Sequence, residues 1–120
     1  MKFLWSTIHV KNLDESILFY SDLCGLKVMQ RFPAGPGAEI AFMGNGVDGE
    51  TLVELYAGDN TINIGDSISI GFAVDSVEAM LDTVKAKNIP LNSEPFETPK
   101  FKWFTIKDPN GLSIQFFQQK

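Results

Sequence analysis

The stretch that decides the fold is Ile68-Ser69-Ile70-Gly71-Phe72-Ala73-Val74-Asp75-Ser76-Val77. From Ser67 to Val74 it has the alternating pattern of a short, half-buried strand. Asp75 or Ser76 can then cap a helix, and Glu78 completes an Asp-x-x-Glu cap. The apolar stripe of this helix consists of Val77, Met80, Leu81 and Val84, and Asn88 and Pro90 close it. The stretch therefore predicts a strand that leads directly into a helix.

The same pair of elements is predicted near the beginning of the chain. An alternating strand runs over Leu4–Val10, and Asn12 follows as a helix cap with Glu15 three residues on. The apolar positions of this helix are spaced by three and four residues and comprise Leu13, Ile17, Tyr20 and Cys24. Gly25 is placed to end it.

Each helix is followed by further strand-like segments with turn residues between them. After the first helix these are Lys27–Phe32, Ala38–Met43 and Thr51–Tyr56; after the second they are a short segment near Leu91, Lys102–Lys107 and Leu112–Gln118. The order β-α-β-β-β thus occurs twice, which predicts an α+β fold of two tandem modules within a single domain, 1–120. The modules span about 1–60 and 66–120, with residues 57–66 as the connector. In each module the helix covers one side of the sheet, and the other side is free to line a cavity.

Composition excludes several functional classes. The net charge of −5 and the absence of a Lys/Arg cluster argue against nucleic acid as a partner. No run reaches the roughly 18 apolar residues of a membrane span, so no membrane partner is expected either. The single cysteine, Cys24, cannot form an internal disulfide, which favours a cytoplasmic location. An apolar fraction of 44% is sufficient to fill a core.

The order and spacing of several motifs resemble the vicinal oxygen chelate superfamily, and glyoxalase I in particular. The motifs are Val10-Lys11-Asn12-Leu13, Leu23-Cys24-Gly25-Leu26-Lys27, Leu52-Val53-Glu54-Leu55, Val74-Asp75-Ser76-Val77 and Asp108-Pro109-Asn110-Gly111-Leu112. The superfamily also contains bleomycin-resistance proteins and extradiol dioxygenases. The resemblance covers essentially the whole chain. It implies a curved mixed sheet around an open cup, and a homodimer.

The resemblance also implies four strand positions that hold a divalent metal in the family. By spacing they fall on Trp5, Glu54, Ser69 and Gln115. Only Glu54 is a strong ligand for such an ion, because serine and glutamine are weak neutral donors and the indole of Trp5 has no lone pair to offer. No cofactor is therefore expected. The alternative is that a divalent metal is recruited through Glu54, Gln115 and water.

Strand alternation predicts which side chains would line the cup. Trp5, Thr7 and His9 share one face of their strand; Leu52, Glu54 and Tyr56 share a face of theirs. In the second module, one strand carries Ser67, Ser69 and Gly71 on its inner face, and the last strand carries Ser113, Gln115 and Phe117. Trp103 lies on the strand Lys102–Lys107. His9 is about 13 Å along the strand from Trp5, so it would not join Glu54 at the metal position. It either contacts a ligand or is a partly exposed strand residue.

Such a lining suits a planar or hydrophobic small molecule, cationic ones included. The leading prediction is a metal-free binding protein that uses Trp5, Tyr56, Trp103 and Phe117, with Thr7, His9, Ser69 and Gln115 as further ligand contacts and Glu54 as the charge partner. The alternative is a glyoxalase-like lyase or isomerase in which Glu54 is the catalytic base, with or without a metal. A third possibility is an interaction or regulatory module with an empty cup.

Overall fold

The computed structural model describes residues 1–58 and 61–120, arranged as two units, Met1–Ile64 and Gly65–Lys120. The predicted order β-α-β-β-β is confirmed in both units, so the chain consists of two tandem modules of an α+β fold. Two residues of the predicted connector, Asp59 and Asn60, lie outside the described residues.

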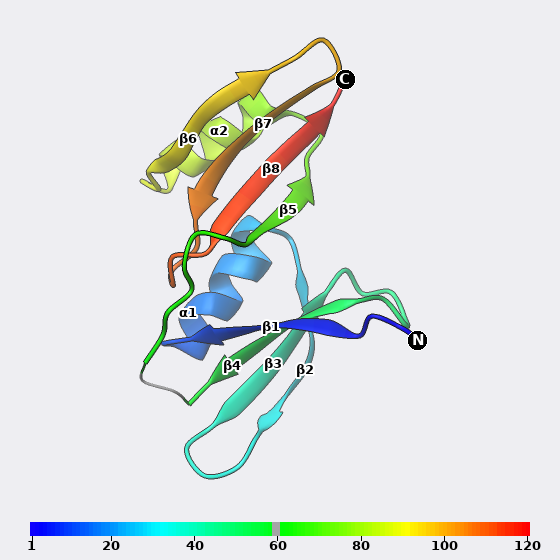
Figure 1. Ribbon diagram of the computed structural model, residues 1–120, viewed down its shortest axis with the longest axis vertical. Helices are drawn as coiled ribbons and strands as arrows, with labels where there is room; N and C mark the ends of the chain where they lie inside the picture. Colours follow the sequence, from blue (N-terminus) through cyan, green and yellow to red (C-terminus); the bar gives the residue numbers. More distant parts are fainter. Residues whose placement is uncertain (59–60) are drawn as a thin grey trace. The chain divides into compact units, whose positions relative to one another are not determined.

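Unit 1 contains a four-stranded mixed sheet (Figure 1). Its elements are β1 (Trp5–Val10), α1 (Leu13–Leu18), the π-helical segment η1 (Phe19–Leu23), β2 (Lys27–Pro33), β3 (Glu39–Gly44) and β4 (Leu52–Ala57). The spatial order is β1-β4-β3-β2. Strand β1 runs parallel to β4, and the other two pairs are antiparallel. Because parallel neighbours cannot be joined by a tight turn, the helix and two strands lie between β1 and β4 in the sequence.

Unit 2 repeats this topology. Its elements are β5 (Ser69–Ala73), α2 (Val77–Ala86), β6 (Leu91–Glu97), β7 (Phe101–Lys107) and β8 (Ser113–Gln119). The spatial order is β5-β8-β7-β6, again with one parallel pair, β5 and β8. The segment predicted near Leu91 is a full strand of seven residues, which pairs with β7 through irregular register shifts. Pro95 within this segment obscured its length, because proline weakens a strand prediction.

Both helices begin as the caps predict. The Asn12 side chain accepts a hydrogen bond from the backbone N–H of Glu15 at 2.9 Å, and that of Ser76 accepts one from Ala79 at 3.1 Å. Ser76 is therefore the cap of α2, and Asp75 is not. The first N–H groups of a helix have no partner within the helix. That of Val77 in α2 donates a hydrogen bond of 2.8 Å to the side chain of Gln118 on β8. No helix in residues 1–58 and 61–120 is long and apolar enough to cross a membrane.

The first helix differs from the prediction in its second half. The α-helix ends at Leu18 and continues as a π-helical turn, in which the Cys24 N–H bonds to the carbonyl of Phe19, five residues back. The wider turn places Tyr20 fully in the core, whereas Cys24 is only half-buried. A single π turn adds one residue without disturbing the apolar spacing that predicts a helix, so the sequence pattern does not reveal it.

Each sheet is covered by its helix on one side and open on the other. Helix α1 contacts β3 and β4, and α2 contacts β7 and β8. The core residues of unit 1 include Ile8, Val10, Ala41, Met43 and Leu55, and those of unit 2 include Phe104, Ile106, Ile114 and Phe116. The residues that alternate with them point to the open side of each sheet.

A chain of ion pairs lies on the helical side of unit 2. Lys102 pairs with Glu78 of α2 and, at 3.7 Å, with Glu97, which also pairs with Lys120. The hydrogen bond with Glu78 raises the pKa of Lys102, and the hydrogen bond with Lys120 lowers the pKa of Glu97. These ion pairs link α2 to strands β6 and β7 and to the end of the chain.

Candidate functional site

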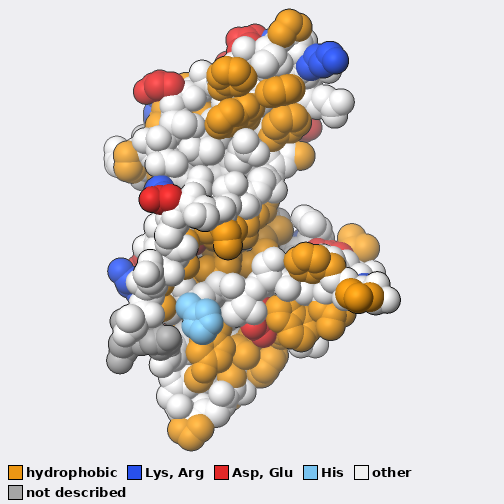
Figure 2. Space-filling view, in the orientation of Figure 1, with side chains coloured by type: hydrophobic (Ala, Val, Ile, Leu, Met, Phe, Trp, Pro, Cys, Tyr) orange, Lys and Arg blue, Asp and Glu red, His pale blue; other side chains and the backbone are white. Residues whose placement is uncertain are grey.

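The open side of the unit 1 sheet carries the residues that alternation predicts. Cross-strand pairing sets Trp5 beside Leu52, Thr7 beside Glu54 and His9 beside Tyr56. The next strand, β3, adds Phe42 beside Glu54. Figure 2 shows hydrophobic side chains gathered over this part of the sheet, with acidic atoms among them.

Glu54 is the acidic group at the centre of this face, and only 9% of its surface is exposed. The Thr7 hydroxyl donates a hydrogen bond of 2.7 Å to its Oε1 atom. A nearly buried carboxylate is costly unless it is hydrogen-bonded, and it can accept more than one such bond. Glu54 therefore keeps capacity to accept from a ligand donor or to attract a cation.

Aromatic rings flank Glu54 along the sheet. The ring of Trp5 meets that of Phe42 edge to face, with centroids 5.1 Å apart, and 44% of Trp5 is exposed. On the other side of Glu54, the rings of His9 and Tyr56 lie 5.1 Å apart. His9 thus contacts Tyr56. It is two residues beyond Thr7 on β1 and pairs with Tyr56, whereas Thr7 pairs with Glu54.

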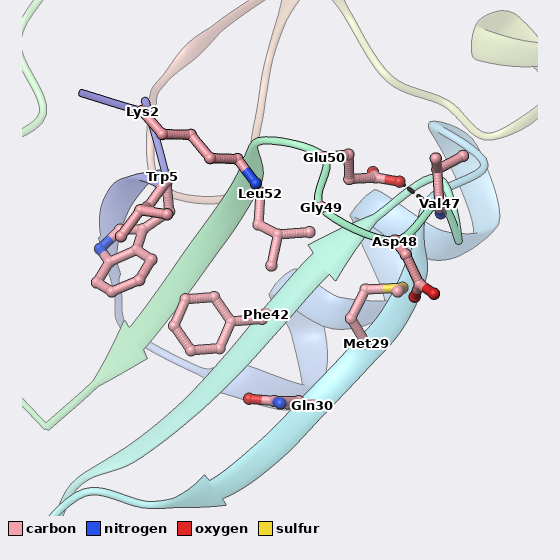
Figure 3. A pocket seen from close by; sticks show the side chains of 11 residues that line it. Lys2, Trp5, Met29, Gln30, Phe42, Val47, Asp48, Gly49, Glu50 and Leu52 are labelled. Carbon is pink, nitrogen blue, oxygen red and sulfur yellow. Dashed lines mark hydrogen bonds between the residues drawn. The ribbon is translucent and has the colours of Figure 1, made fainter.

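A hollow of about 420 Å³ adjoins Trp5 between the sheet and residues 47–50. Figure 3 shows Trp5, Phe42 and Leu52 together on its floor, with Met29 at one side. Its rim includes Glu50, whose carboxylate accepts hydrogen bonds from the backbone N–H groups of Asn45 and Val47. These bonds hold the 44–50 loop beside the hollow, which is large enough for a small ligand.

The open side of the unit 2 sheet carries a row of aromatic residues. Phe96, Trp103 and Phe117 are successive cross-strand neighbours on β6, β7 and β8. The rings of Phe96 and Trp103 lie 5.6 Å apart, and Phe101 stacks on Phe117 at 5.3 Å. Hydrophobic side chains over these strands are visible in Figure 2.

A polar row lies beside the aromatic row. Gln115 of β8 is flanked in register by Gly71 of β5 and Thr105 of β7. Ser69 pairs with Ser113 one step further along and is exposed, whereas Ser67 precedes β5 and so is not part of the strand. The prediction from strand alternation that Ser69 and Gly71 share one face, and that Gln115 and Phe117 share one face, agrees with the pairing of β5 with β8.

Comparison with known proteins supports the family resemblance that the sequence motifs indicate. Residues 2–116 match the family model described as the Glyoxalase/Bleomycin resistance protein/Dioxygenase superfamily. The chain belongs to this superfamily. A lactoylglutathione lyase of Neisseria meningitidis is 28% identical over 128 aligned positions, which cover 100% of this chain and 92% of the relative.

Two solved structures share the fold of this chain. Glyoxalase I of Leishmania major superposes with a TM-score of 0.83 at 23% identity, over 98% of this chain and 86% of that one. TnmS3, an antibiotic binding protein of a Streptomyces species, superposes with a TM-score of 0.78 at 19% identity, over 100% of this chain and 97% of that one. At these identities the likeness shows the fold.

The side chains present do not fit the metal that the superfamily implies. Of the four positions that the resemblance implies, Trp5 offers no available lone pair, Ser69 and Gln115 are neutral, and Glu54 is the single carboxylate. Within residues 1–58 and 61–120, no three His, Cys, Asp or Glu side chains gather into a potential metal site. A single carboxylate with neutral neighbours is a weak donor set for a divalent ion.

Several residues of these faces were missing from the prediction. Phe42 lies in the apolar run Ala41-Phe42-Met43, which shows no alternation to reveal its direction. Phe96 lies on the strand whose length Pro95 obscured. Thr7 was expected to contact a ligand, but its hydrogen bond to Glu54 depends on the register of β1 against β4, which no local pattern gives.

Proposed function

We propose that this chain is a small-molecule-binding protein that works without a metal ion. Its ligands are planar or hydrophobic compounds, including cationic ones, which bind through Trp5, Tyr56, Trp103 and Phe117. The observation that carries the proposal is Trp5, a half-exposed indole at a family metal position, packed against Phe42 and bordering a hollow. Half-exposed aromatic side chains on an open face favour stacking with a flat ligand.

Glu54 is the charge partner in this proposal. It is nearly buried, it lies between two aromatic pairs, and Thr7 fixes one of its oxygen atoms. A planar cation over Trp5 or Tyr56 gains attraction from the ring face as well as from the carboxylate. The fold neighbour TnmS3, an antibiotic binding protein, supports a binding function for this scaffold.

Thermal unfolding tests the independence from metal. Untagged protein is heated with Ni²⁺, Co²⁺, Mn²⁺, Zn²⁺ or Fe²⁺, each with and without a chelator. A specific site must stabilise the folded state, by about 2.7 kcal/mol at a hundredfold excess over Kd. We expect no chelator-reversible rise in Tm with any of these ions. A rise with one ion alone would overturn the proposal.

The second candidate is a glyoxalase-like lyase or isomerase with Glu54 as its base. It is favoured by the Thr7–Glu54 hydrogen bond, which orients the carboxylate, and by relatives named lactoylglutathione lyase. If it is correct, Glu54→Gln abolishes lactoylglutathione lyase activity, because an amide cannot accept the proton, while the Tm stays near that of the wild type. Thr7→Val is the matched variant: it keeps the carboxylate, and turnover is expected to fall only in part. Equal activity of wild type and Glu54→Gln would exclude this candidate.

A homodimer and a cytoplasmic location complete the proposal. The homodimer rests on the resemblance to short superfamily members. The location rests on the single cysteine and on the absence of any membrane-spanning helix from residues 1–58 and 61–120.

A further inference from the structure

The chain contains two Asn-Gly pairs, Asn45-Gly46 and Asn110-Gly111. In such a pair the backbone nitrogen of the glycine can attack the side-chain amide carbon of the asparagine, because glycine has no side chain to hinder the approach. The reaction needs an accessible amide and a backbone N–H that no other group holds. The two pairs differ in both respects.

The first pair is open to this reaction. Asn45 and Gly46 are both exposed, in the loop that joins β3 to β4. Within residues 1–58 and 61–120, neither the Asn45 side chain nor the Gly46 N–H makes a hydrogen bond. Gly46 has a φ of 87°, in the left-handed region that glycine adopts without strain. Both the attacking nitrogen and the amide are therefore available.

The second pair is held in a bonded turn. The Gly111 N–H donates to the carbonyl of Asp108 at 3.1 Å, and the Asn110 N–H donates to the Asp108 side chain at 2.8 Å. Asn110 is half-buried, and Asp108 is buried. The same dipeptide is therefore protected here, because the turn must open before Gly111 can attack.

A positive charge lies beside the first pair. A Cβ atom built on Gly46 would stand 3.3 Å from the Nζ atom of Lys27. Attack on the amide develops negative charge, first on the glycine nitrogen and then on the oxygen of the tetrahedral intermediate. An adjacent ammonium group stabilises such charge and so accelerates the reaction.

We propose that Asn45 is a site of spontaneous deamidation, which releases the 44–50 loop. The Gly46 nitrogen forms a bond to Cγ of Asn45, and the bond from Cγ to the side-chain nitrogen breaks. That nitrogen leaves as ammonia, with the proton that Gly46 gives up. Water then opens the resulting succinimide ring and leaves aspartate or isoaspartate at position 45.

Either product disturbs the hydrogen bonds that hold this loop. The Glu50 carboxylate accepts from the N–H groups of Asn45 and of Val47, the latter at 2.6 Å (Figure 3). A new carboxylate at position 45 repels that of Glu50. Isoaspartate also adds an atom to the backbone between the two N–H groups, so Glu50 can no longer accept from both. Since residues 47–50 border the hollow, deamidation is a slow, one-way change at its rim.

The test follows both asparagines by mass spectrometry in protein aged in mildly alkaline buffer, once folded and once in urea. In the folded protein we expect Asn45 to deamidate at least about tenfold faster than Asn110, because the 108–111 turn must open first. In urea neither pair is protected, and the two rates should be similar. Equal rates in the folded protein, or an unchanged Asn45, would overturn the proposed site.

Two variants test the loop and the role of Lys27. Asn45→Gln keeps an amide but would have to close a larger ring, so it should not deamidate. Hydrogen exchange at the Val47 N–H should become faster in aged wild type and stay slow in aged Asn45→Gln; unchanged exchange in deamidated wild type would overturn the release of the loop. Lys27→Gln should slow deamidation of Asn45 about fivefold and leave Asn110 unaffected. An unchanged rate at Asn45 would contradict the part assigned to Lys27.

Discussion

Trp5→Ala is expected to abolish measurable binding of a planar cation such as proflavine. The substitution removes the half-exposed ring that borders the hollow and leaves Glu54 without its aromatic neighbour Trp5 on β1. Loss of a central tryptophan from a binding site typically costs about 2–4 kcal/mol, which is roughly a 30- to 1,000-fold rise in Kd. Proflavine fluorescence, titrated with wild type and variant, measures the change.

A matched variant separates stacking from mere bulk. Trp5→Phe keeps an aromatic face on the same strand position and should retain most of the affinity, whereas Trp5→Leu keeps volume but no ring and should resemble Trp5→Ala. Because 44% of Trp5 is exposed, all three variants should remain folded. Unchanged affinity in Trp5→Ala would remove Trp5 from the site and with it the observation on which the proposed function rests.

The largest effect on stability is expected for Phe116→Ala. Phe116 is 1% exposed, and its ring lies 5.4 Å from that of Phe104 and 6.3 Å from that of Phe72. Removing such a ring leaves a cavity in the core and costs about 3–5 kcal/mol. This is a large part of the 5–15 kcal/mol that stabilises a typical domain. Urea denaturation, followed by circular dichroism, is the measurement.

The next residue in the chain provides the control. Phe117 points to the open side of the same strand and is only half-buried, so Phe117→Ala should cost less than about 1.5 kcal/mol. The same substitution should weaken the binding of a planar ligand such as proflavine, because it removes a stacking surface. Equal losses of stability in Phe116→Ala and Phe117→Ala would contradict the assignment of these neighbours to opposite faces.

Local patterns predicted most of the fold because each acts over a few residues. Asn12 and Ser76 cap their helices with the hydrogen bonds that their position before an apolar stripe implies. Alternation correctly assigned Thr7 and Glu54 to one face, since successive strand residues point to opposite sides. The π-helical turn at Phe19–Leu23 had no such signal, and the strand that contains Pro95 had a weakened one.

The sequence by itself determined that there are two βαβββ modules and where most of their strands and helices lie. Its resemblance to the superfamily implied that Trp5 and Ser69 stand where family members hold metal ligands. Only the tertiary structure decided that Thr7 donates a hydrogen bond to Glu54 and that Phe42 and Phe96 extend the aromatic faces. The physical reason is that strand neighbours come from distant parts of the chain. Their register depends on the packing of whole sheets, which no short stretch of sequence encodes.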